Sequence, residues 1–160
     1  MKKKIFIGLG ILLLAFVGFL AYTSLFPKSP PTTVSFSDQG LDIKVSYSQP
    51  SKRGRLIFGE QSEGALQPYG QYWRLGANAA TEITFNKNVT FAGKPVSAGS
   101  YRMYAVPGPV SFQISLNSEV GVYFANEEPD YSKDVIKVDV PVSAAPGETE
   151  KFTISFLSDS

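Results

Sequence analysis

An apolar, uncharged segment at the N-terminus constrains this chain more than any other feature. Lysines occupy positions 2–4, the segment runs from Ile5 to Phe26, and Pro27 ends it. A helix rises about 1.5 Å per residue, so about 20 such residues span the hydrocarbon core of a bilayer. We therefore predict a short basic end at residues 1–4 and a transmembrane helix over residues 5–26.

The length of this segment favours an uncleaved signal anchor over a secretory signal peptide. A signal peptide has an apolar core of about 7–15 residues followed by a small-x-small cleavage site. Here the apolar run is longer, and the nearest such site, Ala21-Tyr22-Thr23, is a poor one. A cleaved signal is the alternative, and the lack of cysteine excludes a lipid-modified N-terminal Cys. Because the lysines precede the helix, the positive-inside rule predicts a cytoplasmic N-terminus and an exported C-terminal domain.

The composition of the rest of the chain excludes several classes of function. Residues 1–28 hold four lysines and no acid, so residues 29–160 carry 11 basic and 14 acidic residues, a net charge of −3. This balance argues against nucleic acid as a partner and against electrostatic attraction to anionic lipid. The chain also lacks His and Cys, which excludes Ser-His-Asp and Cys-His catalysis and the usual zinc and copper sites. We therefore predict no enzyme activity, no cofactor and no metal.

Short strands follow a proline-rich spacer at residues 27–33. Leu41, Ile43, Val45 and Tyr47 alternate with polar residues, which is typical of a half-buried strand. Further strands are predicted at 34–36, 56–58, 83–85, 89–91, 101–106, 111–116, 120–124, 135–142 and 151–157. Since no amphipathic helix follows the N-terminal segment, we predict an all-β, antiparallel β-sandwich or jelly-roll-like domain over residues 34–160.

One dense stretch of sequence resembles a known family. Residues 69–81 read Tyr-Gly-x-x-Trp-Arg-x-Gly-Ala-Asn-x-Ala-Thr. Together with residues 97–101 and 47–55, this pattern resembles the Domain of Unknown Function 2911 family over about residues 32–157. The resemblance implies an exported bacterial β-domain whose activity is unassigned, so it supplies no catalytic residues. Family members usually continue past the 152–156 strand, which implies that a chain ending at Ser160 is a shortened member or an incomplete product.

The same stretch holds the candidate binding residues, and two interpretations of it are open. The candidates are Tyr69, Tyr72, Trp73, Arg74, Asn78 and Glu82. Aromatic, Arg, Glu and amide side chains together suit a polar ligand surface. In the structural interpretation, Trp73 is a core aromatic, Arg74 pairs with Glu82 or covers an aromatic ring by a cation–π contact, and Gly76 and Asn78 adopt positive φ in a turn. The small-residue run favours the structural interpretation, because it fills space better than it binds.

Two charged loops are predicted to be solvated. The acidic residues of 127–134 fit no EF-hand spacing, and residues 52–55 form a basic turn with a minor chance of docking an anionic partner. The sequence therefore predicts a non-catalytic, membrane-tethered binding module of the bacterial envelope for a glycan, a peptide or an envelope protein. The alternatives are an assembly partner of another membrane protein and, less favoured, a carboxylate-based glycan hydrolase.

Overall fold

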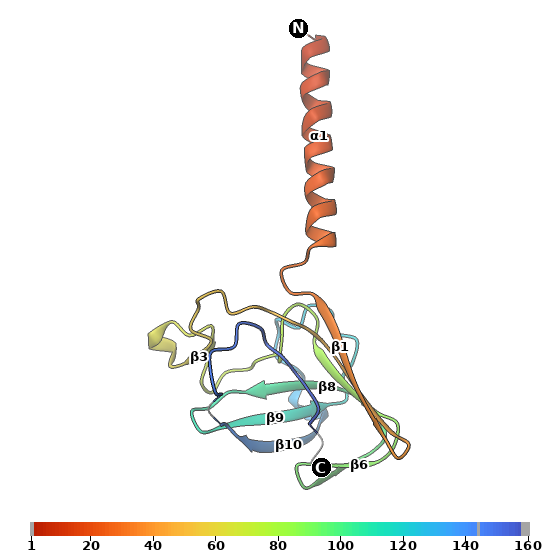
Figure 1. Ribbon diagram of the computed structural model, residues 1–160, viewed down its shortest axis with the longest axis vertical. Coiled ribbons are helices and arrows are strands. Elements are labelled where there is room, and N and C mark those ends of the chain that lie inside the picture. Colours follow the sequence, from red (N-terminus) through yellow and green to blue (C-terminus); the bar gives the residue numbers. More distant parts are fainter. Residues whose placement is uncertain (1, 144, 158–160) are drawn as a thin grey trace.

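A long N-terminal helix stands apart from a β-rich domain in the computed structural model, which describes residues 2–143 and 145–157 (Figure 1). Helix α1 covers Lys2–Leu25. Its Phe6–Leu25 portion has 20 residues and a mean hydropathy of 2.3, and it is not buried against the rest of the protein. The described residues thus hold one helix long and apolar enough to cross a membrane. Its length and composition fit a membrane span or a signal sequence.

The domain is built on one six-stranded sheet in the order β1-β2-β5-β8-β9-β10, with every neighbouring pair antiparallel. The strands are β1 (Pro31–Asp38), β2 (Leu41–Ser48), β5 (Thr81–Phe85), β8 (Gly99–Val106), β9 (Ser111–Asn117) and β10 (Asp134–Pro141). The predicted antiparallel β class with a preceding apolar helix is confirmed. Strand β1 begins at Pro31, so the last three residues of the predicted 27–33 spacer belong to the sheet.

Smaller elements and an extended C-terminal segment lie against this sheet instead of a complete second sheet. They are the parallel pair β3 (Phe58–Gly59) and β4 (Gln67–Pro68), the antiparallel pair β6 (Val89–Phe91) and β7 (Lys94–Val96), and the 3-10 turns η1 (Gln61–Glu63) and η2 (Tyr131–Lys133). In the C-terminal segment, the half-buried Phe152, Ile154 and Phe156 pack on the core. Their spacing of two is that of an extended chain with one apolar face.

The hydrophobic core lies on one face of the sheet. The loop before β5 contributes Trp73 and Leu75. The strands contribute Val45, Tyr47, Ile83, Phe85, Tyr101, Met103, Ala105, Leu116, Ile136 and Val138. Trp73 and Ala105 exchange two backbone hydrogen bonds of 2.7 and 2.8 Å, so Trp73 extends the sheet beside β8 where β5 is absent. Trp73 is therefore a core residue, as one interpretation of the sequence predicted. Backbone pairing with Ala105 holds it there, in addition to the packing of its side chain.

Two predicted strands differ in the structure. Residues 120–124 form a loop, because Gly121 has a φ of 78° and Tyr123 and Phe124 are exposed. The backbone groups of this loop bond to another loop, with Ala80 N–H donating to Val122 O at 2.9 Å. Residues 151–157 are extended but form a single bridge, between Lys151 and Ser51. For residues 151–157 the alternating pattern correctly predicted which side chains face the core. The segment is not a full strand, because no neighbouring strand pairs with it along its length.

Candidate functional site

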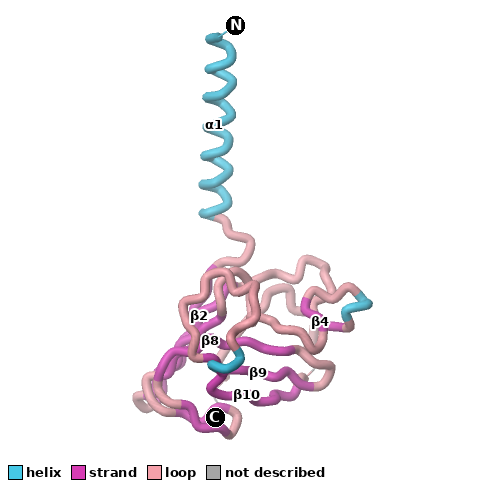
Figure 2. The backbone as a smooth tube through the Cα atoms, turned by 180° about the vertical axis from the view of Figure 1, so that it is seen from behind, coloured by secondary structure: helices cyan, strands magenta, loops and turns pink. Residues whose placement is uncertain are grey.

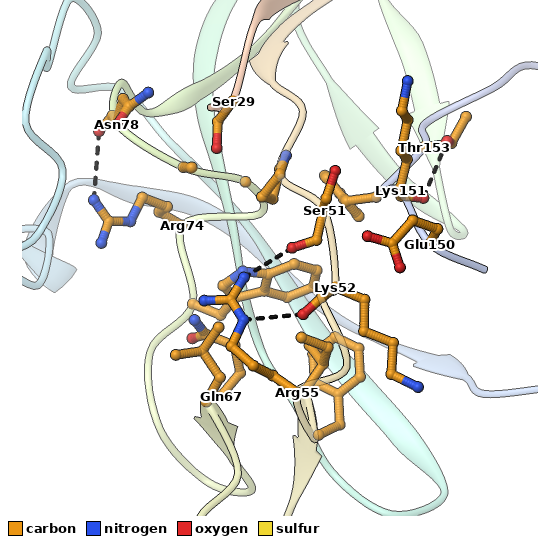
Figure 3. A pocket seen from close by; sticks show the side chains of 18 of the residues that line it. Ser29, Ser51, Lys52, Arg55, Gln67, Arg74, Asn78, Glu150, Lys151 and Thr153 are labelled. Atoms are coloured by element: carbon orange, nitrogen blue, oxygen red, sulfur yellow. Dashed lines mark hydrogen bonds between the residues drawn. The ribbon is translucent and has the colours of Figure 1, made fainter. Parts of the chain in front are cut away.

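A groove of about 780 Å³ lies beside Trp73 (Figure 3). Its walls come from residues 50–58, residues 73–78 and the C-terminal residues 149–153. The floor is aromatic: the ring centroid of Trp73 lies 5.0 Å from that of Phe58 and 5.1 Å from that of Phe152, both edge-on. Trp73 is only 6% exposed. It therefore acts mainly as a core residue and shows the groove a small part of its surface.

A tight basic turn forms one rim of the groove. Arg53 and Gly54 have φ values of 53° and 68°, and Arg55 N–H donates to Lys52 O at 3.2 Å. Positive φ at both central residues is characteristic of a type I′ turn. Arg55 folds back over this turn, donating from Nε to Lys52 O at 2.9 Å and from Nη2 to Ser51 O at 2.8 Å (Figure 3). The turn predicted to be solvated thus holds a guanidinium at the groove.

Cations outnumber carboxylates along the groove. Its charged lining residues are Lys52, Arg55, Arg74, Lys151 and Glu150. Lys52 Nζ donates to Glu148 Oε1 at 2.6 Å, just outside the lining. This hydrogen bond and the charge of Lys52 lower the pKa of Glu148. Glu150 Oε1 accepts from the backbone N–H of Arg53 at 3.1 Å. The groove consequently favours an anionic ligand.

The small-residue run shapes the end of the groove near Arg74. Asn78 has a φ of 58°, and Gly76 has a φ of 152°, where a Cβ atom would lie 2.8 Å from Ser48 O. The positive φ predicted for these two residues is confirmed. Arg74 Nη1 donates to Asn78 O at 3.4 Å and to Asn126 Oδ1. The run thus lets the backbone approach β2 closely and places Arg74 at the mouth of the groove.

The structure separates the six predicted binding residues into three groups. Trp73, Arg74 and Asn78 line the groove. Tyr69 lies outside the lining and is half-buried, with its N–H bonded to Gly59 O at 3.0 Å. Tyr72 and Glu82 belong to the opposite face of the sheet. Glu82 Oε1 accepts from Gly121 N–H at 2.5 Å and forms no ion pair with Arg74 within the described part of the chain.

That opposite face carries a polar row to which each of the six strands contributes one residue. In register order the row is Thr33, Ser46, Glu82, Arg102, Asn117 and Asp134. Arg102 is 2% exposed, and its Nη2 donates to Tyr72 Oη at 2.6 Å and to Glu127 O at 3.1 Å. Its Nη1 lies 3.5 Å from Glu119 Oε2. The two terminal nitrogens of the buried guanidinium are therefore paired, as burial requires, while Nε is buried with no hydrogen-bond partner among the described residues.

The loop between β9 and β10 covers this row, and η2 crosses in front of β8 and β9 in Figure 2. Tyr104 Oη donates to Asp134 Oδ2 at 2.7 Å, and Asn117 Nδ2 donates to Asp134 Oδ1 at 2.8 Å. Burial, followed by the neighbouring Asp134 carboxylate, raises the pKa of Tyr104 well above its usual range. The side chain of Asp134 is 6% exposed and belongs to this hydrogen-bond network, which corrects the prediction that Asp134 belongs to a solvated acidic loop.

The other acidic residues of the loop, Glu127, Glu128 and Asp130, are exposed, as predicted for a solvated loop, and the last two also accept hydrogen bonds through their side chains. Asp130 Oδ1 accepts from the Ser132 N–H at 3.0 Å and from its hydroxyl at 2.6 Å. These bonds cap η2 and lower the pKa of Asp130. Across residues 2–143 and 145–157, no three acidic side chains are grouped in a way that would hold a metal ion. The loop therefore covers the polar row.

Sequence reasoning missed two sets of residues that the structure makes prominent. Lys52, Arg55 and Lys151 line the groove, although they were assigned to a solvated turn or to a strand. For Lys52 and Arg55 the signal was the 47–55 segment, which is part of the family pattern; no signal in the sequence marked Lys151. Arg102 was not singled out, although a lone guanidinium inside the otherwise uncharged 101–106 segment indicates a paired buried charge.

The comparisons with known proteins agree with the pattern in residues 69–81. No curated protein and no solved structure matches the chain. The model of one family, described as a protein of unknown function (DUF2911), matches residues 29–160. That match covers the whole β-domain, the basic turn and the groove, and the chain therefore belongs to the DUF2911 family.

Proposed function

We propose that this protein is a single-pass, membrane-anchored binding module of the bacterial cell envelope, and that its groove binds an acidic polypeptide segment of a partner protein. The observation that carries the proposal is the combination in one groove of an aromatic floor with four basic side chains and one carboxylate. Apolar side chains of the ligand would meet the floor, and its carboxylates would meet the rim.

The physical properties of α1 support the proposed anchor. Its Phe6–Leu25 portion has a mean hydropathy of 2.3 and no contact with the domain that buries it. Such a surface is stable in lipid and costly in water. With lysines at positions 2–4, the positive-inside rule leaves the domain on the periplasmic side. The spacer between α1 and β1 is short, so the groove stays near the membrane.

A polypeptide fits the floor better than a sugar chain does. Binding of a sugar ring by an aromatic side chain uses an open ring face. The indole of Trp73 is instead enclosed edge-on by Phe58, Phe112 and Phe152. Arg55 and Arg74 offer planar guanidinium groups, which bind carboxylates in a bidentate way. Acidic side chains separated by apolar ones supply both kinds of contact.

The chemistry of the groove supports a role without catalysis. The chain has no His or Cys. A carboxylate-based hydrolase needs two acidic groups, one of them protonated near neutral pH by a raised pKa. Glu150 is the one carboxylate among the described lining residues, and the pKa of the nearby Glu148 is lowered. A lowered pKa is the opposite of what a general acid requires.

Intrinsic fluorescence offers a direct test, because Trp73 is the only Trp and lies on the groove floor. We would titrate the full-length protein in detergent micelles with a peptide of alternating Glu and Leu. We expect a saturable change in Trp emission, and Arg55→Gln or Arg74→Gln should weaken binding by about tenfold, the effect of one lost charge-assisted hydrogen bond.

Lys44→Gln is the matched control, because it removes one exposed cation from β2 outside the groove lining. It should leave the affinity within about twofold of the original value. An oligogalacturonate is titrated in parallel as an acidic glycan. Saturable binding of the glycan alone would contradict the polypeptide assignment. An equal loss of affinity in the groove variants and in Lys44→Gln would contradict the groove assignment.

A further inference from the structure

Loops from distant parts of the sequence lie at the end of the domain that carries α1. Figures 1 and 2 show these loops at the junction with the helix. A cavity of about 630 Å³ is lined jointly by Tyr22 and Phe26 from the helix end and by Gln49, Arg53 and Lys151 from the domain. Arg53 Nη2 also donates to Lys28 O at 3.4 Å. These loops therefore face the surface from which α1 emerges.

Basic residues are concentrated at this end. The cations of the spacer, of the basic turn and of the groove rim are Lys28, Lys52, Arg53, Arg55, Arg74 and Lys151, and the neighbouring carboxylates are Glu148 and Glu150. Residues 29–160 as a whole carry 11 basic and 14 acidic residues. The net negative charge of the domain argues against attraction to anionic lipid. The charges are unevenly distributed, however, and this end of the domain is basic. Attraction depends on charges within about a Debye length of the surface, about 8 Å at physiological salt.

Two exposed aromatic side chains lie at the same end. Tyr123 and Phe124 are 68% and 69% exposed and stack edge-on with ring centroids 4.6 Å apart. Tyr123 shares a surface depression with Pro31 and Thr32, at the start of β1, and Phe124 lines the groove mouth. Aromatic rings beside cations are the side chains enriched at membrane–water interfaces.

We propose that this basic, aromatic end of the domain docks on the anionic lipid headgroups of the leaflet from which α1 emerges. The inference rests on the proposed membrane anchor. The connection between α1 and β1, residues 26–30, reaches about 17 Å when fully extended, so the domain always stays close to the headgroups. Docking gives anionic partners to Lys28 and Arg53, which lie outside the groove lining, and places the exposed rings at the interface.

The absence of cysteine makes single-site labelling direct. Val120→Cys puts a fluorophore in the loop that carries Tyr123, and Thr90→Cys puts one on β6, at the end far from α1 (Figure 1). The full-length chain is reconstituted in vesicles of phosphatidylcholine with or without phosphatidylglycerol, and quenching by nitroxide-labelled headgroups is measured. We expect strong quenching at position 120 in the anionic vesicles, reduced by added salt, and weak quenching at position 90.

Charge removal distinguishes docking from mere tethering. Lys28→Gln with Arg53→Gln should lower the docked-to-free ratio by roughly 10–30-fold. Neither residue lines the binding groove. Lys44→Gln with Lys87→Gln removes the same charge elsewhere and should change nothing. Equal quenching at positions 120 and 90, or at position 120 in both kinds of vesicle, overturns the docking. Loss of the chain from the vesicles during an alkaline wash would refute the anchor instead.

Discussion

Replacing Trp73 by alanine tests whether this residue is mainly part of the core. Trp73 is 6% exposed and contacts Phe58, Phe112 and Phe152 edge-on. A buried Trp removes about 150–250 Å² from water, which at about 25 cal/mol per Å² amounts to about 4–6 kcal/mol. Measured Trp→Ala truncations in cores cost about 3–5 kcal/mol. We expect Trp73→Ala to lower the free energy of unfolding by about 4 kcal/mol.

Thermal unfolding of the full-length chain in micelles, followed by circular dichroism in the β-sheet region, measures this loss. For a domain of this size, about 4 kcal/mol corresponds to a decrease in Tm of about 12–20 °C. Tyr123→Ala is the control, because that ring is 68% exposed and lies in a loop. It should change the unfolding free energy by no more than about 0.5 kcal/mol.

One result would refute the core assignment. If Trp73→Ala melts within a few degrees of the original protein and yet no longer binds the Glu–Leu peptide, the indole is a ligand contact. Binding to this variant would be followed with a fluorescent peptide, since its own Trp signal is lost. A large loss of stability with binding retained at low temperature leaves the groove function to Arg55 and Arg74.

The remaining predictions concern the opposite face. Arg102→Leu should lower the unfolding free energy by about 1–3 kcal/mol, because it removes the hydrogen bonds from the guanidinium to the half-buried Tyr72 hydroxyl and to Glu127 O; urea unfolding measures this, and a stabilised variant would contradict the network. Alkaline pH should also destabilise the fold. Burial raises the pKa of Tyr131 from 10.0 to about 12, and that of Tyr104 rises further. A folded-state pKa above the unfolded value gives stability that is complete below pH 10.0 and is lost as the pH rises through the folded pKa. Tyr104→Phe should therefore flatten the fall in unfolding free energy above that pH, and an unchanged slope would contradict the assignment.

Strand periodicity predicted the β-sheet well where one face is buried. In β2, Val45 and Tyr47 are buried while Asp42 and Lys44 are exposed. The 135–142 prediction matches β10, in which Ile136 and Val138 face the core. A one-residue slip would turn every apolar side chain outward, so burial fixes the pattern strongly. Residues 120–124 are also apolar but have no buried face, since Val120, Tyr123 and Phe124 are all exposed.

The candidate site was harder to predict because consecutive residues in an extended chain point in opposite directions. Tyr72, Trp73 and Arg74 were grouped as one surface. Backbone pairing of Trp73 with Ala105 makes this segment strand-like, so Trp73 enters the core while Tyr72 reaches Arg102 on the other face. Arg102, Asn117 and Asp134 meet only through strand register. Strand register depends on which strands pair in the folded domain, so it cannot be predicted from the composition of the individual strands.

The groove follows from the way the second layer of the domain is built. On the polar face, a loop with many specific hydrogen bonds covers the row around Arg102. On the core face, the C-terminal segment is held to the basic turn by two backbone bonds, Lys52 N–H to Glu150 O at 2.6 Å and Phe152 N–H to Pro50 O at 3.0 Å. A complete second sheet would fill the space beside Trp73. Two extended segments joined so sparsely leave it open, with their polar side chains at the rim. Because α1 leaves the domain at this same end, the proposed membrane anchor would make a partner that enters the groove approach along the membrane surface.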